Sequence, residues 1–308
     1  MIDVLVIGNV TVDHVLTLDG PPPRGEKAYA SALSAYPGGQ AANAAYTMAC
    51  LGLAVRFVGR FGADAAGRES WNVLMEAGCE LTGSMFVEDC PHSFAAVMID
   101  SCTGDRSIVT YRDPRISMPQ GALVPEGFAD VRAFYSDGME PAATLRGLRL
   151  ARAAGVMTFA DAESTDWLSD GLPWLDELVS PATVLRELAS EADQRPDDAP
   201  LPSAELLESI ARRGPRTVVA TAGAAGCAGL ASEPAPTLVS VPALDICPVD
   251  TTGAGDAFHG GYLAARLRGF PLRQALEFAT AAAAVACATW GPRPPMARLR
   301  ELAHQLTK

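Results

Sequence analysis

The segment Gly253-Ala254-Gly255-Asp256 has the residue types and the spacing of a phosphoryl-transfer site, and an Ala- and Leu-rich stretch that predicts a helix follows it. Glycines leave backbone N–H groups uncovered, and N–H groups at a helix start attract anions because the helix dipole adds to them. A carboxylate beside that anion is unfavourable unless it takes up a proton. The segment therefore predicts Asp256 as the base that activates an alcohol for attack on a phosphoryl group. The alternative is that Asp256 only caps the helix.

A second glycine element, Thr221-Ala222-Gly223-Ala224-Ala225-Gly226, follows the predicted strand RTVVAT. Its backbone amides could hold the phosphates of a nucleotide, although an ordinary strand-to-strand turn would have the same residues. The dinucleotide pattern G-x-G-x-x-G does not follow the first strand, where Gly8-Asn9-Val10 stands, and no Walker-type G-x-x-x-x-G-K-[ST] occurs. A nucleotide site in this chain would therefore use neither common phosphate loop.

A third group of polar residues lies near the N-terminus, where Asp13 follows the first strand and Gly38-Gly39 precedes Asn43. A polyol needs paired acceptors and donors, which an aspartate, an asparagine side chain and uncovered backbone amides together supply. We expect these residues to bind a polyol. Asp13 as a turn former and Asn43 as a helix-surface residue remain the alternatives.

The elements that would position these residues alternate between strands and helices from residue 131 onward, which predicts a mostly parallel sheet with helices on both faces. Two β-only segments, approximately 12–36 and 92–112, interrupt this alternation and are expected to form a small lid within one domain spanning 1–308. A helix from Gly38-Gly39 to about Leu51 has a small inner face that can approach a sheet closely. The acidic, Pro-rich stretch 191–203 predicts an exposed connection.

Composition excludes several classes of protein. Acidic residues exceed basic ones by 36 − 24 = 12 among 308 residues, which argues against a nucleic-acid partner. No apolar run approaches the roughly 18 residues of a membrane span, and no basic leader precedes the first strand, so we expect neither a membrane partner nor a signal peptide. Seven cysteines without a C-x-x-C pair fit free thiols in a reducing cytoplasm, and four scattered histidines predict no zinc site.

The motifs GNVTVDH, PGGQAANAA, TAGAAG and VDTTGAGDAFHGG resemble those of the ribokinase-like (PfkB) carbohydrate kinases over nearly the whole chain. The resemblance implies a three-layer α/β/α fold with a central, mostly parallel sheet and a small β lid. It also implies transfer of the γ-phosphoryl group of ATP, with Mg²⁺, to a hydroxyl of a sugar. A homodimer that pairs through the lid is a further expectation.

Roles carried over from the family by motif are expectations for individual residues. Asp256 would be the base, and Gly253, Ala254 and Gly255 would form the anion hole. Sugar contacts would come from the N-terminal motifs, and nucleotide contacts from two later segments. Those contacts would be Asp13, Gly39 and Asn43 for the sugar, and Thr221, Gly223, Gly226, Thr252 and Thr280 for the nucleotide. Asp250 and Thr251 occupy the place where many members hold a monovalent cation such as K⁺, with carbonyls near Gly291 as a further contribution.

Departures from the family pattern bear on substrate and metal. Ribokinases carry Lys where Gln40 stands and Asn where Thr11 stands, so ribose itself is disfavoured. The family's N-x-x-E element is missing from the expected stretch 180–187. Glu187 could substitute for it, but a helix-surface role is expected. No residue can therefore be assigned as an Mg²⁺ ligand, and the ion is expected to be held by the nucleotide and water.

Three residues give weaker information about the acceptor. Lys27, on a predicted lid strand, and Arg112, after the lid hairpin, could bind an anionic substituent, or could be exposed edge-strand cations. Asp137, at the end of a parallel strand, could contact the sugar or form a turn. A nucleoside kinase with an aromatic shelf in the lid is the alternative function, and a non-catalytic sugar- or nucleotide-binding protein is the alternative of another class.

Overall fold

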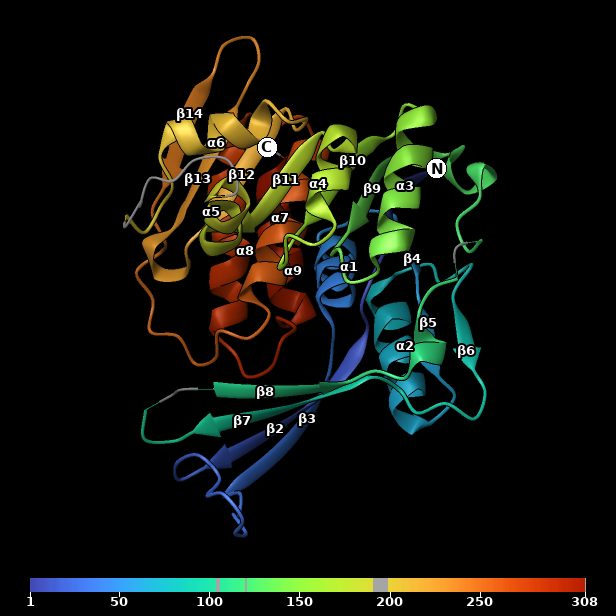
Figure 1. Ribbon diagram of the computed structural model, residues 1–308, viewed down its shortest axis with the longest axis vertical. Coiled ribbons are helices and arrows are strands. Elements are labelled where there is room, and N and C mark those ends of the chain that lie inside the picture. Colours follow the sequence, from blue (N-terminus) through green and yellow to red (C-terminus); the bar gives the residue numbers. More distant parts are fainter. Residues whose placement is uncertain (104–105, 120, 191–198, 308) are drawn as a thin grey trace.

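An eight-stranded sheet forms the centre of the fold (Figure 1), as seen in a computed structural model that describes residues 1–103, 106–119, 121–190 and 199–307. The strand order is β14-β13-β12-β11-β10-β9-β1-β4. All neighbours from β12 to β4 are parallel, whereas β13 and β14 are antiparallel. The strands are β1 (Ile2–Ile7), β4 (Val55–Val58), β9 (Val131–Ser136), β10 (Met157–Asp161), β11 (Glu177–Pro181), β12 (Thr217–Thr221), β13 (Cys227–Ala231) and β14 (Thr237–Val241).

Helices cover both faces of this sheet, which confirms the predicted three layers. The strand β1 shows why, because Val4 and Val6 enter one hydrophobic core while Leu5 and Ile7 enter the other. Helices α1, α2, α7, α8 and α9 pack in the first core and α3 to α6 in the second. Their bounds are α1 (Gln40–Cys50), α2 (Ala65–Ala77), α3 (Pro141–Ala153), α4 (Leu168–Gly171), α5 (Ala182–Ser190), α6 (Ala204–Ala211), α7 (Ala254–Leu267), α8 (Leu272–Cys287) and α9 (Met296–Ala303).

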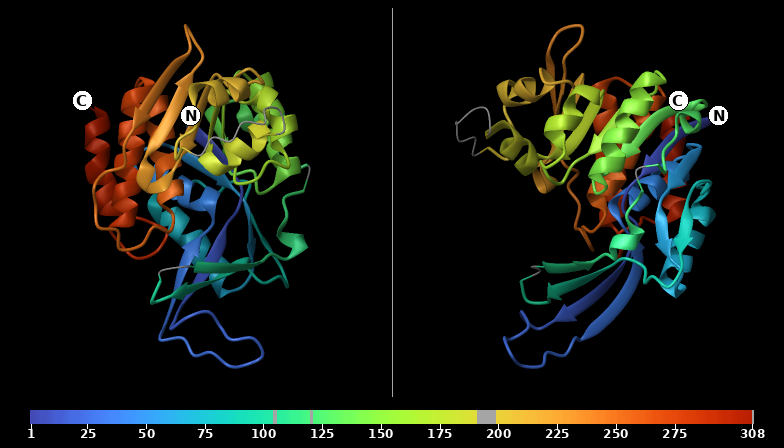
Figure 2. Two further views of the ribbon diagram at one scale, coloured as in Figure 1. Left: turned by 60° about the vertical axis from the view of Figure 1, so that its left-hand side comes forward. Right: turned by 45° about the vertical axis from the view of Figure 1, so that its right-hand side comes forward.

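A separate four-stranded sheet, with the order β3-β2-β7-β8, forms the predicted lid. Its strands are β2 (Thr11–Leu18), β3 (Ala32–Gly38), β7 (Phe94–Asp100) and β8 (Arg106–Tyr111). The central pair β2 and β7 is parallel, and the two outer pairs are antiparallel. Figures 1 and 2 show this sheet projecting away from the main body. The prediction that Lys27 lies on a lid strand is wrong, because the chain between β2 and β3 is irregular around that residue.

Helices α1 and α7 approach closely because their facing residues are small. A Cβ atom on Gly260 of α7 would lie only 2.8 Å from Cβ of Thr47 and 3.0 Å from the carbonyl oxygen of Ala44, both on α1. The inner face of α1 is lined by buried alanines, as predicted. This close crossing brings the start of α7 to the side chains of α1.

Some elements were not predicted. The short parallel pair β5 (Arg60–Gly62) and β6 (Met85–Val87) and the helix α9 have no counterpart in the expectations. Most of the predicted connection 191–203 lies outside the described residues, since 191–198 are not described, and 199–203 contain neither helix nor strand. Within the described parts of the chain, no helix has the length and apolar character that crossing a bilayer requires.

Candidate active site

The start of α7 has the geometry of an anion-binding helix terminus. Gly253 precedes the helix with φ 72°, a left-handed conformation that favours glycine, and a Cβ atom there would collide with the carbonyl of Pro292. By contrast, a Cβ atom on Gly255 would meet nothing within 4 Å. Among the described residues, no backbone acceptor is recorded for the N–H groups of Gly255 and Asp256. These donors are therefore available to an anion, and the side chain of Asp256 lies on the same turn.

Asp256 is partly buried and is held from α1. The side-chain amide Nδ2 of Asn43 donates a hydrogen bond of 2.8 Å to Oδ2 of Asp256. Burial raises the pKa of Asp256 to about 7, and the negative charges of Glu163, Asp137 and Asp13 add to that rise, while the bond from Asn43 opposes it. A carboxyl group with a pKa near neutrality is matched to accepting a proton at physiological pH.

This pKa predicts the pH dependence of the reaction. Asp256 must be ionised to accept a proton, and the raised pKa means that half of it is protonated near pH 7. We expect kcat/KM to rise with pH through about 7 and then to level off. An ordinary aspartate, with a pKa near 3.8, would already have reached that plateau by about pH 5. A profile that is flat from pH 5 to 8 would contradict the proposed environment of Asp256.

The predicted acceptor residues gather beside this helix start. Thr11, the first residue of β2, donates from Oγ1 to Oδ1 of Asp13 over 3.0 Å, and burial raises the pKa of Asp13. A Cβ atom on Gly38 would collide with the carboxyl group of Asp13, so the lid strand β3 passes directly over it. Gly39 precedes α1 with φ 93°, and Gln40 is the first residue of that helix. Their contact with a sugar stays a prediction.

Asp137, which follows β9, is hydrogen-bonded to the backbone at the start of α1 and after β1. The residue is 1% exposed, and its carboxyl group accepts backbone N–H bonds from Asn9 (2.8 Å), Ala41 (3.1 Å) and Met139 (3.0 Å). These bonds join the ends of β1 and β9 to the start of α1. The structure therefore favours the turn role that the sequence left open, and a sugar contact from Asp137 stays a prediction.

The two candidate cations of the lid differ in their surroundings. Lys27 is exposed. Arg112 is half-buried, pairs with Glu140, and donates from Nη1 to the carbonyl of Met139 over 3.3 Å. The reading of Arg112 as an exposed edge-strand cation is therefore wrong, and its contact with an anionic substituent stays a prediction.

The predicted nucleotide segment forms a tight turn between β12 and β13. The N–H of Ala222 donates to the carbonyl of Gly226 over 2.9 Å, and Gly226 has φ 88°. On α8, Thr280 donates to the carbonyl of Leu276 and lies 3.9 Å from Sγ of Cys227. The structure thus brings the Thr221–Gly226 turn and Thr280 together, and their role toward a nucleotide stays a prediction.

Asp250 ties the segment before α7 to the segment after α8. Its two carboxylate oxygens accept backbone N–H bonds of 2.9 Å, from Thr252 and from Gly291. Each carboxylate oxygen therefore has one protein donor. Each of these oxygens keeps a further lone pair, and a monovalent cation at Asp250 and Thr251 stays a prediction.

The side chains of the described residues do not form a fitting site for Mg²⁺. In the described parts of the chain, one cluster with metal-ligand spacing is present, formed by Asp161, Asp256 and His259. Asp161 and His259 are buried, and Nδ1 of His259 lies 3.3 Å from the carboxylate of Asp161. Mg²⁺ prefers oxygen ligands and keeps several waters, so a buried imidazole and carboxylate do not suit it. At the stretch that lacks N-x-x-E, Ser180 is buried and Glu187 accepts from Thr165 at the surface, as predicted for Glu187.

Sequence reasoning missed Arg293, which the structure places next to the candidate base. Its Nε donates a 2.9 Å bond to Oδ1 of Asn43, and its guanidinium lies 5.5 Å from the ring centre of Tyr46. Asp161 and His259, beneath Asp256, were missed as well. Arg293 and Asp161 stand outside the motifs named above, and tertiary packing alone brings them to the site. His259 lies within VDTTGAGDAFHGG, but no role was expected for it.

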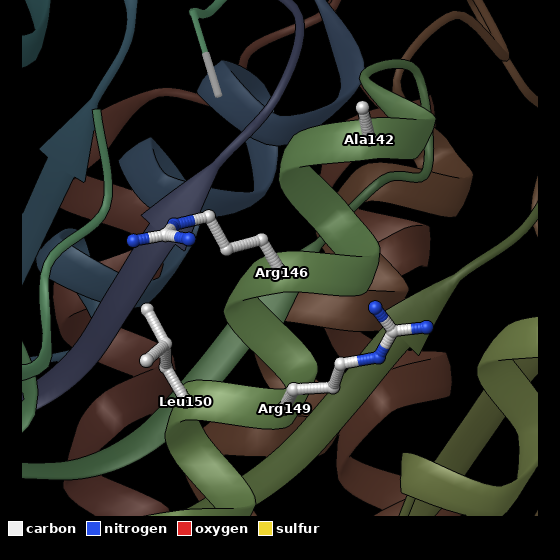
Figure 3. Close-up of a pocket in the computed structure, with 4 residues that line it drawn as sticks. All are labelled: Ala142, Arg146, Arg149 and Leu150. Atoms are coloured by element: carbon white, nitrogen blue, oxygen red, sulfur yellow. The ribbon is translucent and has the colours of Figure 1, made fainter. Parts of the chain in front are cut away.

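A hollow on the surface lies away from this site, on the exposed face of α3. It measures about 310 Å³ and is lined by Ala142, Arg146, Arg149 and Leu150. Figure 3 shows the two arginines extending in different directions from the helix. Arg146 donates to the carbonyl of Leu123 over 2.8 Å, and Arg149 lies over the ring of Trp174. The two guanidinium groups do not converge on a common point, so this hollow offers no anion site.

Comparisons with known proteins agree with this architecture. The model of the pfkB family of carbohydrate kinases matches residues 1–298. The chain is 26% identical to ribokinase of Haemophilus influenzae over 290 residues (91% of this chain, 90% of the relative) and 25% identical to nucleoside kinase of Methanothermobacter thermautotrophicus over 282 residues (91% and 88%). The structure of Arabidopsis thaliana ribokinase complexed with ribose and ATP matches it with a TM-score of 0.79 and 23% identity, covering 98% of this chain and 99% of that one. With the family match extending over nearly its whole length, the chain belongs to the pfkB family of carbohydrate kinases.

Proposed function

We propose that this carbohydrate kinase transfers the γ-phosphoryl group of ATP to a hydroxyl group of a sugar or sugar derivative, with Asp256 as the general base. The observation that carries the proposal is the position of Asp256. Its carboxyl group stands on the first turn of α7, beside N–H groups that have no recorded protein acceptor, and its pKa is raised to about 7. A base and an anion site on one helical turn are what alcohol-to-phosphoryl transfer requires.

In the proposed step, the acceptor hydroxyl donates a hydrogen bond to the carboxylate of Asp256. Its oxygen attacks the γ-phosphorus while its proton moves to Asp256, and the bond from that phosphorus to the β,γ-bridging oxygen breaks. ADP leaves with the electron pair of that bond, and Asp256 later returns the proton to solvent. The N–H groups of Gly253, Gly255 and Asp256 stabilise the charge on the transferring group. The N–H of Ala254 donates to the carbonyl of Thr251 over 3.3 Å, so it is the one member of the expected anion hole that is already occupied.

The acceptor and ATP would lie on opposite sides of Asp256. The acceptor would lie between the carboxyl edge of the central sheet and the lid, against Asp13, Gly39 and Asn43. ATP would extend toward the Thr221–Gly226 turn, Thr252 and Thr280. Mg²⁺ would arrive with the nucleotide and its waters, since the side chains that the structure describes offer no fitting ligand set. K⁺ would bind at Asp250 and Thr251, with carbonyls near Gly291. We further propose that the enzyme is cytoplasmic and that two copies pair through their lids to form a homodimer.

A panel of acceptors tests this function. Purified protein is incubated with ATP, Mg²⁺ and single ketoses, aldoses, sugar acids or nucleosides, and both ADP release and the phosphorylated product are measured. We expect a sugar or sugar derivative to give the highest kcat/KM. A nucleoside as the preferred acceptor would replace the sugar in the proposal. Stabilisation by ligands without any product would contradict phosphoryl transfer.

Asp13 provides a prediction about the acceptor site. Replacing Asp13→Asn removes a charged acceptor, and hydrogen bonds to charged groups contribute about 1.5–3 kcal/mol, so kcat/KM for the sugar should fall by about 10- to 100-fold. The KM for ATP should stay within about twofold, because Asp13 lies on the lid strand β2 rather than near the Thr221–Gly226 turn. Arg24→Met, in the exposed stretch between β2 and β3, is the control and should leave both parameters unchanged. Equal effects on sugar and ATP would contradict the placement of Asp13.

A further inference from the structure

We propose that Arg293 is a positioning residue, which fixes the side-chain amide of Asn43 so that this amide holds Asp256 in its ionised, proton-accepting state. This inference rests on the proposed role of Asp256 as the base. It adds a residue that lies outside every motif of the sequence analysis. The evidence is a continuous chain of two hydrogen bonds from Arg293 to Asn43 to Asp256.

The direction of these bonds is fixed by chemistry. The Nε–H of Arg293 can only donate, and it lies 2.9 Å from Oδ1 of Asn43. Asn43 must therefore present its oxygen to the arginine and its NH₂ group to Asp256, to whose Oδ2 it donates over 2.8 Å. A flipped amide would place two acceptors against each other at the carboxylate and two donors against each other at the arginine. Arg293 thus selects the amide orientation that favours an ionised Asp256.

Arg293 is itself held firmly in this place. Nη2 donates to the carbonyl of Gly38 over 3.4 Å, and the guanidinium lies 5.5 Å from the ring centre of Tyr46 on α1. The hydroxyl group of Tyr46 donates to the carbonyl of Pro294, the next residue along the chain, over 3.2 Å. The segment between α8 and α9 is thereby attached to α1, so the position of the guanidinium follows that of Asn43.

The charge of Arg293 is not used in an ion pair within the described parts of the chain. Its recorded hydrogen bonds go to an amide oxygen and a backbone carbonyl, and Nη1 is buried without a recorded partner. Asp13 and Asp256 both interact electrostatically with it. A cation near Asp256 favours the ionised carboxylate, in the same direction as the bond from Asn43.

Opposing groups face Asp256 from the other elements. Charged or titratable side chains reach it from the lid, from the ends of β9 and β10, and from α7 itself. They are Asp13, Asp137, Glu163, Asp161 and His259. Glu163, Asp137 and Asp13 raise the pKa of Asp256, so the chain from Arg293 through Asn43 is what limits that rise. Loss of Arg293 should therefore raise the pKa of Asp256 further.

The experiment compares the pH profile of kcat/KM for the wild-type enzyme, Arg293→Met, Arg293→Lys and Arg298→Met. An ordered hydrogen bond to the ionised form of a carboxyl group lowers its pKa by about one unit, so loss of the orientation of Asn43 in Arg293→Met should move the acidic limb up by roughly one pH unit. If the midpoint of the acidic limb moves from about pH 7 to about pH 8, kcat/KM at pH 7 falls about fivefold, whereas at pH 9 it returns to the wild-type value. Arg293→Lys, which keeps the charge, should lie between the two. Arg298, exposed on α9, is the control and should not shift the limb.

A double-mutant cycle separates positioning from a direct charge effect. If Arg293 acts through Asn43, Arg293→Met should add less than twofold to the loss already caused by Asn43→Ala. An acidic limb that stays in place in both Arg293 variants, a loss that persists at pH 9, or fully multiplicative losses in the cycle would overturn the inference. Failure of the base assignment would look different, because the wild-type enzyme itself would then lack an acidic limb near pH 7. If Arg293→Met does not fold, Arg293→Lys carries the test.

Discussion

Replacing Asp256→Asn should lower kcat by about 10²- to 10⁴-fold, the range expected when a general base is lost, with the affinity for ATP unchanged. The asparagine keeps the shape of the side chain and can still accept the bond that Asn43 donates to Oδ2. It cannot take up the proton of the acceptor hydroxyl. Initial rates of ADP release and the Kd for ATP, measured on the same preparations, check this result. Unchanged turnover would remove Asp256 from the role of base.

Thermal unfolding shows whether the Asp256→Asn variant is intact. The pKa of Asp256 is raised in the folded state from 3.8 to about 7, so the folded protein disfavours the charge. Below pH 3.8 the carboxyl group is neutral in both states and no penalty exists. The penalty grows as pH rises from 3.8 to about 7, because the unfolded chain is ionised while the folded group resists ionisation. The variant should therefore be more stable than the wild-type enzyme at pH 8, and the difference should shrink at pH 4.

Replacing Gly253→Ala should lower both activity and stability. The residue has φ 72°, which costs an alanine about 1–2 kcal/mol, and its Cβ would collide with the carbonyl of Pro292. The start of α7 must then shift, and the amides next to Gly253 move away from the transferring phosphoryl group. Loss of one such donor typically costs about 10²- to 10³-fold in kcat. Steady-state kinetics and the midpoint of thermal unfolding measure the two effects.

Gly269→Ala is the matched control for this variant. Gly269 follows α7 at its other end with φ 84°, and a Cβ atom there would meet nothing within 4 Å. It should incur the same conformational cost without the collision, so stability falls slightly and kcat stays within twofold. If Gly253→Ala retained full activity, the geometry of the helix start would not matter for catalysis.

Local patterns explain why the frame of this fold could be predicted. Glycines precede both α1 and α7, and both helices are rich in small residues. From these patterns the ends of the two helices could be predicted to within a few residues. The continuous apolar run of β1 indicated a strand buried on both faces, and both cores receive its side chains. The lid was recognised because its segments interrupt the alternation of strands and helices.

The residues that tune the site could not be predicted, because their partners are distant in sequence. Arg293 contacts Asn43 across 250 positions, and no local pattern marks it. Asp137 follows the end of a parallel strand, a position that suits either a ligand contact or a structural turn. Only the structure, in which three backbone N–H groups donate to its carboxylate, favours the turn. Lys27 lies within the β-only segment 12–36, but β3 begins only at Ala32, so the residue falls before the strand.

The most direct test of the account is a single-turnover measurement of phosphoryl transfer. Enzyme in excess over γ-labelled ATP is mixed with a saturating amount of the preferred sugar, and the labelled sugar phosphate is quantified after rapid quenching, for the wild-type enzyme and for Asp256→Asn. We predict that the transfer rate of the variant falls by about 10²- to 10⁴-fold while the label remains bound as ATP. Equal transfer rates in the two proteins would contradict the claim that Asp256, at the start of α7, takes the proton of the attacking hydroxyl.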